Sequence, residues 1–188
     1  MSATGHTLFD SAFGTCAIAW SERGVIAVQL PEADTASTRA RLLRRWPALP
    51  AAEPPADVRD AIDGIRALLG GEPVDLGGVR LDMHDIEPLP RRVYEIARDI
   101  PRGRTLSYGD IALRLGDKAL ARAVGQALGH NPFAPVVPCH RVLAADGRPG
   151  GFSAHGGVRT KLRLLAIEGA RAGQQPDLFG GSADDGTP

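Results

Sequence analysis

Three short apolar stretches separated by turn signals open the chain. Residues 7–10, 15–20 and 25–30 are apolar in character, with Gly14 between the first two and Ser21-Glu22-Arg23-Gly24 between the last two. Short apolar runs joined by glycine-containing turns are typical of consecutive antiparallel strands. The sequence therefore predicts a three-stranded antiparallel meander over residues 7–30.

Two helical patterns follow this meander. The first covers residues 36–46, and the second covers residues 56–69, where apolar side chains recur every three to four positions before Gly70-Gly71. The segment between them, residues 47–55, contains four prolines and is predicted to be a loop. A further strand is predicted over residues 79–83, so the fold class is α/β (α+β).

Composition places the chain among ordinary globular proteins. It has 188 residues, of which 43% are hydrophobic and 23% charged. No apolar run is long enough to span a bilayer, and the first 15 residues lack a signal-peptide pattern, so we expect a cytoplasmic protein with no membrane association. Free thiols are expected at Cys16 and Cys139, and a monomer is the simpler expectation. No Cys or His pair has the spacing of zinc ligands, so we predict no metal and no cofactor.

The net charge of zero conceals an asymmetry along the chain. Residues 1–87 carry 8 Lys/Arg and 13 Asp/Glu, whereas residues 88–170 carry 13 and 6, a net charge of +7. A local excess of this size is compatible with a polyanionic partner, although a charge excess alone is usually just a solvated surface.

The basic segment contains a helix-turn-helix pattern. Helices are predicted over residues 91–100, 108–115 and 118–129, and Ser107 with Asp110 forms a near capping box. The last of these helices exposes mostly Ala and Gly, together with Arg122. Such a face permits close approach to a narrow groove of nucleic acid; the alternative is a packed core helix with Arg122 in solvent.

Cys139 stands directly before His140 within an apolar run, residues 136–142. A reactive thiol needs a neighbouring base or cation, and an adjacent histidine can be either, although two adjacent residues can also be unrelated. The glycine-rich segment 147–157 follows. It is predicted to be a mobile lid or a pocket wall that a substrate approaches closely, or else a surface connection to a helix over residues 158–168, with Leu162, Leu165 and Ile167 apolar.

Several of these motifs together resemble the O6-alkylguanine-DNA alkyltransferase family. The resemblance rests on Pro138-Cys139-His140-Arg141-Val142, on Gly129-His130-Asn131-Pro132, on Ala121-Arg122-Ala123-Val124-Gly125, and on Leu106-Ser107-Tyr108 and Ile167-Glu168-Gly169 in matching order. It is strong over residues 88–170, and over residues 1–85 it is limited to the order of strands and helices. It implies a ribonuclease-H-like domain over residues 1–85 and a mostly helical, winged helix-turn-helix-like domain over residues 86–170.

The resemblance also implies a reaction and its residues. Family members move an alkyl group from guanine oxygen, with O4-alkylthymine as a second candidate substrate, onto their own cysteine, once and irreversibly. Cys139 matches that acceptor, His140 the base that acts through a water, and Glu168 the carboxylate that orients it. The remaining matches are Tyr108 as donor to the departing guanine, Ser153 as donor to its oxygen, Asn131 as the link between helix-turn-helix and active site, and Phe152 and Val142 as pocket residues.

The same resemblance predicts double-stranded DNA as partner, bound in the minor groove with little sequence preference. The target nucleotide must be flipped out of the duplex, and Arg122 matches the residue that fills the vacated space. The DNA-contacting set is predicted to be Ala121, Arg122, Ala123, Gly125 and Arg141.

Two departures from the family pattern concern the pocket. Phe152 stands where a tyrosine is common, and Ser153-Ala154-His155-Gly156-Gly157 is two residues longer than the usual Ser-Gly-Gly. The range of alkyl groups therefore stays open. His155 is expected to be a solvated loop residue, with entry into the site as the alternative.

A polar tail, residues 171–188, is predicted to be disordered. Within it, Gln175-Pro176-Asp177-Leu178-Phe179 is similar to the peptide by which bacterial repair and replication proteins bind the sliding clamp, although Pro176 stands where a leucine is usual. The alternative is that these residues dock on the chain's own surface. Two other functions stay open: a non-catalytic sensor that flips alkylated bases without repairing them, and a cysteine hydrolase or redox protein that turns over repeatedly and ignores DNA.

Overall fold

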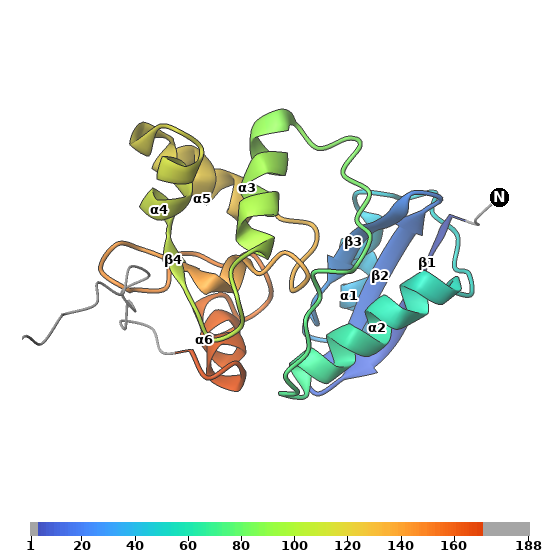
Figure 1. Cartoon of the computed structure of the whole chain (residues 1–188). Coiled ribbons are helices and arrows are strands. Elements are labelled where there is room, and N and C mark those ends of the chain that lie inside the picture. The colour runs from blue at the N-terminus through green and yellow to red at the C-terminus, as the bar shows by residue number, and fades with distance from the viewer. Residues whose placement is uncertain (1–3, 171–188) are drawn as a thin grey trace, which may run out of the picture.

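The computed structural model describes residues 4–170. In Figure 1 the first part of the chain, a sheet with two helices, lies at the right, and the second, mostly helical part lies at the left. The predicted disordered tail and its clamp-binding peptide lie outside the described residues, so their structure stays a prediction.

The first part of the chain forms the predicted antiparallel meander. Its strands are β1 (Gly5–Ser11), β2 (Gly14–Ser21) and β3 (Gly24–Gln29), paired in that order. Gly14 and Gly24 begin the second and third strands with φ of +119° and +137°, in a region that residues with a Cβ rarely adopt. Those glycines allow the tight turns, and the predicted sheet is confirmed.

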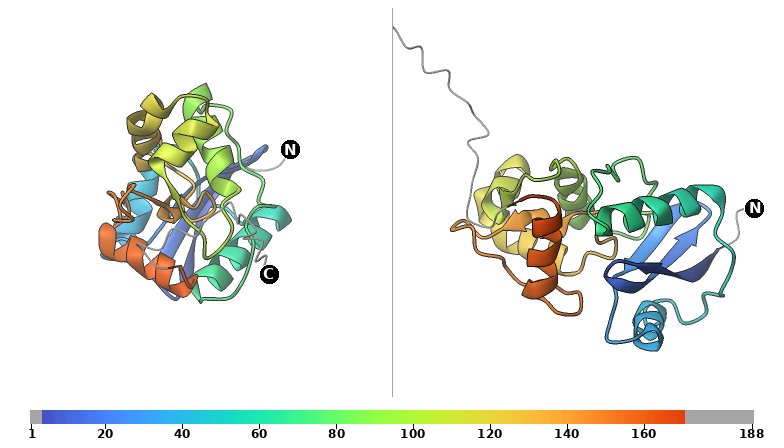
Figure 2. Two further views of the ribbon diagram at one scale, coloured as in Figure 1. Left: turned by 60° about the vertical axis from the view of Figure 1, so that its left-hand side comes forward. Right: turned by 90° about the horizontal axis from the view of Figure 1, so that it is seen from below.

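Two helices cover the opposite faces of this sheet, as the right-hand view of Figure 2 shows. α1 (Thr35–Leu43) begins at Asp34, whose side chain accepts a hydrogen bond from the Ser37 backbone N–H. α2 (Ala56–Leu69) has the predicted bounds and turns its apolar stripe inward; its buried residues are Val58, Ala61, Ile62, Ile65, Leu68 and Leu69. The strand predicted over residues 79–83 is wrong, because only the bridge between Val25 and Leu81 is formed there.

The second part of the chain is mostly helical, as predicted. Its elements are α3 (Pro88–Arg98), β4 (Leu106–Ser107), α4 (Tyr108–Arg114), η1 (Lys118–Leu120), α5 (Ala121–Gly129), η2 (Cys139–Arg141), β5 (Val142–Leu143) and α6 (Val158–Ile167). The first of these helices begins three residues earlier than predicted because a proline is tolerated in the first helical turn, where no intrahelical N–H bond is lost. The predicted single helix over residues 118–129 is a 3₁₀ turn followed by α5.

A second hydrophobic core lies between these helices. The Tyr94 ring of α3 meets the Phe133 ring edge to face at 6.0 Å, and its hydroxyl donates to the Ala127 carbonyl of α5 at 2.9 Å. These contacts attach the helix-turn-helix to the segment that leads to Cys139.

The two parts of the chain share a contact surface. The Val28 N–H of β3 donates to the Pro132 carbonyl at 2.8 Å, and Val136 and Leu164 pack into the core of the first part. The division at residues 85 and 86 stays a prediction. No helix within residues 4–170 is long and apolar enough to cross a membrane.

Candidate active site

Two short strands bring together the two segments of the chain that carry Tyr108 and Cys139. β4 pairs in parallel with β5, with Leu106 opposite Val142. Ser107 accepts from the Asp110 N–H at 3.0 Å while the Asp110 carboxylate accepts from the Ser107 N–H at 2.7 Å, so a full capping box starts α4 at Tyr108. Because β5 directly follows η2, this pairing places Tyr108 near Cys139.

The Cys139 thiol is almost fully buried, with 5% of the residue exposed. Burial raises the pKa of the thiol, while the Asn131 side chain and the positive charge of Lys161 act to lower it. Asn131 is itself fixed, because its amide donates to the Val137 carbonyl at 2.8 Å and accepts from the Phe133 N–H at 2.9 Å. The structure thus holds a protected thiol next to two groups that favour the thiolate.

His140 and Glu168 form a completely buried pair. The distance between His140 Nε2 and Glu168 Oε1 is 2.9 Å, and neither side chain is exposed. Burial would raise the pKa of Glu168, but hydrogen bonds from His140 and Arg141 lower it to about 2. Burial lowers the pKa of His140 despite the opposing effect of Glu168. The histidine is therefore held neutral beside an ionised carboxylate.

The other ring nitrogen of His140 is available for proton transfer. Nδ1 is buried and has no hydrogen-bond partner within the described residues 4–170. With Nε2 donating to Glu168, Nδ1 is the unprotonated nitrogen and can accept a proton. His140, which directly follows Cys139 in the chain, and Glu168 thus supply a base and an orienting carboxylate, the residue types that can activate a cysteine.

Arg141 lies inside the protein rather than on the predicted DNA-contacting surface. Its guanidinium donates to both Glu168 oxygens at 2.8 Å and to the Ile100 carbonyl at 2.6 Å, and its side chain is only 10% exposed. A buried carboxylate needs this charge nearby, which explains why the residue turns inward. We therefore assign Arg141 to the support of Glu168 and not to DNA contact.

Lys161 of α6 is a site residue that the sequence interpretation missed. It is 1% exposed, its Nζ donates to the Val142 carbonyl at 2.6 Å, and it lies 5.8 Å from the centre of the Tyr108 ring. Burial lowers the pKa of the lysine, and Cys139 acts to raise it. A charged side chain this deeply buried points to a functional role.

The inward face of α6 differs from the one predicted. Lys161, Leu164, Leu165 and Glu168 are buried, whereas Leu162 is 41% exposed. The other three buried residues follow Lys161 at spacings of three, four and seven, which is the pattern of one helix face. The sequence alone does not indicate this face, because a lysine is rarely buried.

The Tyr108 side chain fits between two glycines. A Cβ built on Gly150 would overlap the Tyr108 hydroxyl and lie 3.2 Å from its ring, and one built on Gly125 would lie 3.9 Å from the ring. Burial raises the pKa of Tyr108, so its hydroxyl is protonated and can donate a hydrogen bond. The close approach at Gly150 is made by Tyr108, and a pocket wall that a substrate approaches stays a prediction for the glycine-rich segment.

The glycine-rich segment, residues 147–157, forms the rim of the site. Phe152 is partly buried against both cores, while Ser153 is exposed and its carbonyl accepts from Arg41 at 2.7 Å. His155 Nδ1 lies 3.7 Å from a carboxylate oxygen of Glu32, and 56% of the His155 side chain is exposed. Val142 is fully buried; its side chain packs in the hydrophobic core that also contains Cys139, and its carbonyl accepts from Lys161.

The remaining residues that were predicted to contact DNA lie on α5. Arg122 is exposed, and Ala121, Ala123 and Gly125 are partly exposed. Within residues 4–170 there is no cluster of three or more His, Cys, Asp or Glu side chains that could hold a metal ion.

Comparisons with known proteins agree with this geometry. Residues 88–170 match the family model described as the DNA-binding domain of 6-O-methylguanine DNA methyltransferase. A methylated-DNA–protein-cysteine methyltransferase of Methanothermobacter thermautotrophicus is 36% identical over 164 residues, covering 87% of this chain and 82% of that protein. A DNA base-flipping protein of Thermus thermophilus is 44% identical over 108 residues, covering 57% of this chain and 71% of that protein.

A solved structure extends the likeness to the whole fold. The crystal structure of Mycobacterium tuberculosis OGT in complex with DNA superimposes with a TM-score of 0.69 at 31% identity, covering 90% of this chain and 95% of that one. The similarity in sequence and fold spans both parts of the chain. The chain therefore belongs to the methylated-DNA–protein-cysteine methyltransferase family.

Proposed function

We propose that this protein repairs DNA by transferring an alkyl group from the O6 atom of guanine to the Sγ atom of Cys139, once per molecule. The observation that carries this proposal is the buried thiol of Cys139 beside the fully buried His140 and Glu168 pair, in a chain of this family. A soft thiolate suits attack on a saturated carbon, and the thioether that forms is not hydrolysed, which makes the reaction stoichiometric.

The thiol is activated by His140. Its Nδ1 takes the Cys139 proton through a water, while Nε2 stays hydrogen-bonded to Glu168, which stabilises the imidazolium that results. The positive charge of Lys161 stabilises the thiolate. Asn131 holds the segment that carries the thiol, through its hydrogen bond to Val137.

The leaving group is stabilised by hydrogen bonds to the purine. As the new S–C bond forms, the bond between the alkyl carbon and O6 breaks and its electron pair moves into the purine, which then takes up a proton on a ring nitrogen to give guanine, in exchange for the proton that His140 took from the thiol. The Tyr108 hydroxyl donates a hydrogen bond to the purine ring nitrogen, and Ser153 donates one to O6. Phe152 and the backbone at Val142 form the walls around the base, and the longer rim sets the range of alkyl groups.

DNA approaches along α5. Its exposed Ala121 and Ala123 permit close contact with the minor groove, and Arg122 enters the base stack when the nucleotide flips into the pocket. The net charge of +7 over residues 88–170 favours phosphate contacts, which carry little sequence preference. A single exposed arginine on α5 is consistent with a protein that recognises a lesion rather than a sequence.

We also propose that Gln175, Asp177, Leu178 and Phe179 bind a bacterial sliding clamp, which would bring the protein to replicating DNA. The motif in the sequence carries this proposal, since these residues lie outside the described range. A fluorescent peptide of residues 171–188 should bind purified clamp in a polarisation titration, and a peptide with Leu178→Ala and Phe179→Ala should not. Equal signals from both peptides would refute it.

The repair function is tested by measuring whether O6-methylguanine in DNA is converted to guanine. After incubation of a duplex containing O6-methylguanine with the protein, nucleoside analysis of the DNA should find guanine restored in proportion to the protein added. Cys139→Ala should bind the duplex and leave the lesion intact. Lesion-specific binding by the natural protein without restoration would instead favour a non-catalytic sensor that flips alkylated bases; a relative from Thermus thermophilus is named a DNA base-flipping protein.

A further inference from the structure

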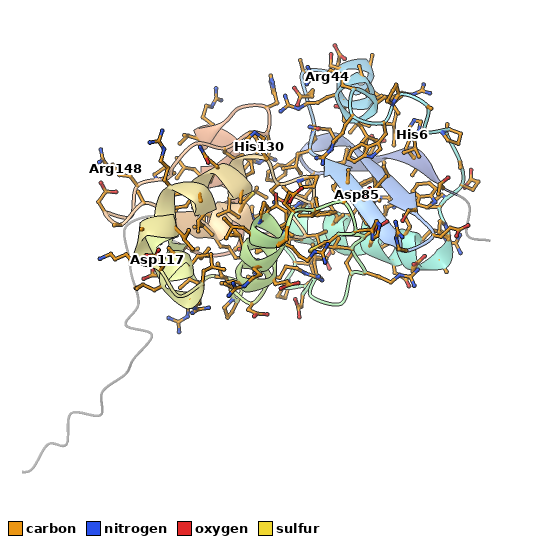
Figure 3. The ribbon with its side chains drawn as sticks, turned by 90° about the horizontal axis from the view of Figure 1, so that it is seen from above. His6, Arg44, Asp85, Asp117, His130 and Arg148 are labelled. Atoms are coloured by element: carbon orange, nitrogen blue, oxygen red, sulfur yellow. The ribbon has the colours of Figure 1, made fainter. Side chains whose placement is uncertain are left out.

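The rim that carries Ser153 is held by the first part of the chain. Arg41, near the end of α1, donates from its Nη2 to the Ser153 carbonyl at 2.7 Å, across 112 positions of sequence. Both residues line a groove of about 540 Å³ that separates α1 from the segment after α5. Arg44 at the end of α1 and His130 at the end of α5, both labelled in Figure 3, line the groove as well.

Arg41 is fixed in place by Glu32. The distance between Arg41 Nε and Glu32 Oε1 is 3.3 Å, and the Glu32 side chain is only 13% exposed. The carboxylate also accepts from the Gln29 side chain at 3.1 Å, and the Glu32 backbone N–H donates to the buried Thr38 hydroxyl at 2.9 Å. The guanidinium that reaches Ser153 is therefore oriented by a carboxylate attached to the sheet.

The same carboxylate meets the lengthened part of the rim. Glu32 Oε2 lies 3.7 Å from His155 Nδ1, so the two oxygens of one side chain face Arg41 and His155. His155 belongs to the two-residue extension of the rim. The extension thus contacts the first part of the chain through His155 and Glu32.

The rim needs such support because its own backbone constrains it little. It contains Gly150, Gly151, Gly156 and Gly157, and the last two have φ of +81° and +50°. Glycine allows more backbone conformations than any other residue, so an unsupported rim would spend less time in the arrangement that binds a base. A charge-assisted hydrogen bond at the middle of the segment counters this freedom.

We propose that Arg41, oriented by Glu32, is a positioning residue that holds the Ser153 rim ready to receive the flipped base. This inference rests on the proposed function, because it assigns the rim to guanine. The first part of the chain thereby acts on the transfer reaction without touching the substrate. Loss of the contact reduces the fraction of molecules with a competent rim, which weakens apparent substrate binding in proportion.

Kinetics of single-turnover transfer test the proposal. Arg41→Ala should raise the half-saturating concentration of a duplex containing O6-methylguanine about fivefold to tenfold, with less than a twofold change in the rate constant at saturation. Arg41→Lys should recover part of the loss, because an ammonium group can still donate to the Ser153 carbonyl. The affinity for an unmodified duplex should not change.

Arg44→Ala is the matched control, since Arg44 lies at the end of the same helix and lines the same groove. It should behave as the natural protein does. An equal loss in Arg44→Ala, or weaker binding of unmodified duplex by Arg41→Ala, would identify Arg41 as a phosphate contact and overturn the proposal.

Amide hydrogen exchange of residues 148–157 provides a readout that needs no activity. In the free protein, exchange in this segment should be faster in Arg41→Ala than in the natural chain or in Arg44→Ala. Unchanged exchange would overturn the inference even if repair proceeds. If the natural protein transfers no methyl group, the proposed function fails, while the exchange result still decides whether Arg41 positions the rim.

Discussion

The substitution Glu168→Gln tests the buried network most sharply. The side chain keeps its size and one carbonyl oxygen, but it loses the negative charge that faces Arg141 and His140 at 2.8 and 2.9 Å. The Arg141 guanidinium, 10% exposed, would then lack a counter-charge. Removing one partner of a buried ion pair typically costs about 3 to 5 kcal/mol.

The lowered pKa of Glu168 gives a second measure of the stability that is lost when the carboxylate is removed. A carboxyl group that ionises at about pH 2 when folded and at pH 4.5 when unfolded contributes roughly 3 kcal/mol to stability at neutral pH. Because the folded pKa is the lower one, this contribution is complete above pH 4.5 and is lost as the pH falls from 4.5 toward 2. Total stabilities of about 5 to 15 kcal/mol make such a loss readily measurable.

Urea denaturation followed by circular dichroism provides the assay. At pH 7 the free energy of unfolding of Glu168→Gln should be roughly 3 kcal/mol below that of the natural protein. The difference should shrink as the pH falls below 4.5. Glu95→Gln, at an exposed position of α3, is the matched control and should change stability by less than about 0.5 kcal/mol. A difference below about 1 kcal/mol at pH 7, or one that is independent of pH, would refute the reasoning.

Further predictions concern the reaction itself. Gly150→Ala should slow transfer at least about tenfold, because its Cβ would displace the Tyr108 hydroxyl; the effect should shrink in a Tyr108→Phe background, as single-turnover rates will show. Lys161→Met should slow alkylation of Cys139 by iodoacetamide at pH 7 about tenfold, which corresponds to a rise of about one unit in the thiol pKa; an unchanged rate would exclude electrostatic support. Arg122→Ala should weaken binding of a lesion-containing duplex and leave iodoacetamide reactivity unchanged, with loss of both indicating misfolding.

Local patterns predicted much of the fold. The meander over residues 7–30 and the helix over residues 56–69 were predicted correctly because turn glycines and apolar periodicity act through neighbouring residues. The strand over residues 79–83 was not, because its apolar character serves core packing and a single bridge to Val25. Strand pairing depends on partners that are distant in sequence, and composition does not reveal them.

In the candidate site, too, some residues could be predicted from local motifs and others could not. Cys139, His140 and Tyr108 could be identified from motifs, and the structure brings them together through the pairing of β4 with β5. The buried roles of Lys161 and Arg141 were missed because both residue types are usually exposed. Their inward orientation follows from hydrogen bonds to Val142 and Glu168, which exist only once α6 has packed against η2.

The central claim is that Cys139 is the acceptor in a reaction that each molecule performs once. Intact mass spectrometry of the protein after incubation with excess duplex containing O6-methylguanine tests it most directly. The account predicts an added methyl group that maps to Cys139 and never exceeds one per molecule, at any time or any excess of DNA. An unmodified protein that has restored many equivalents of guanine, or a methyl group on another residue, would contradict it.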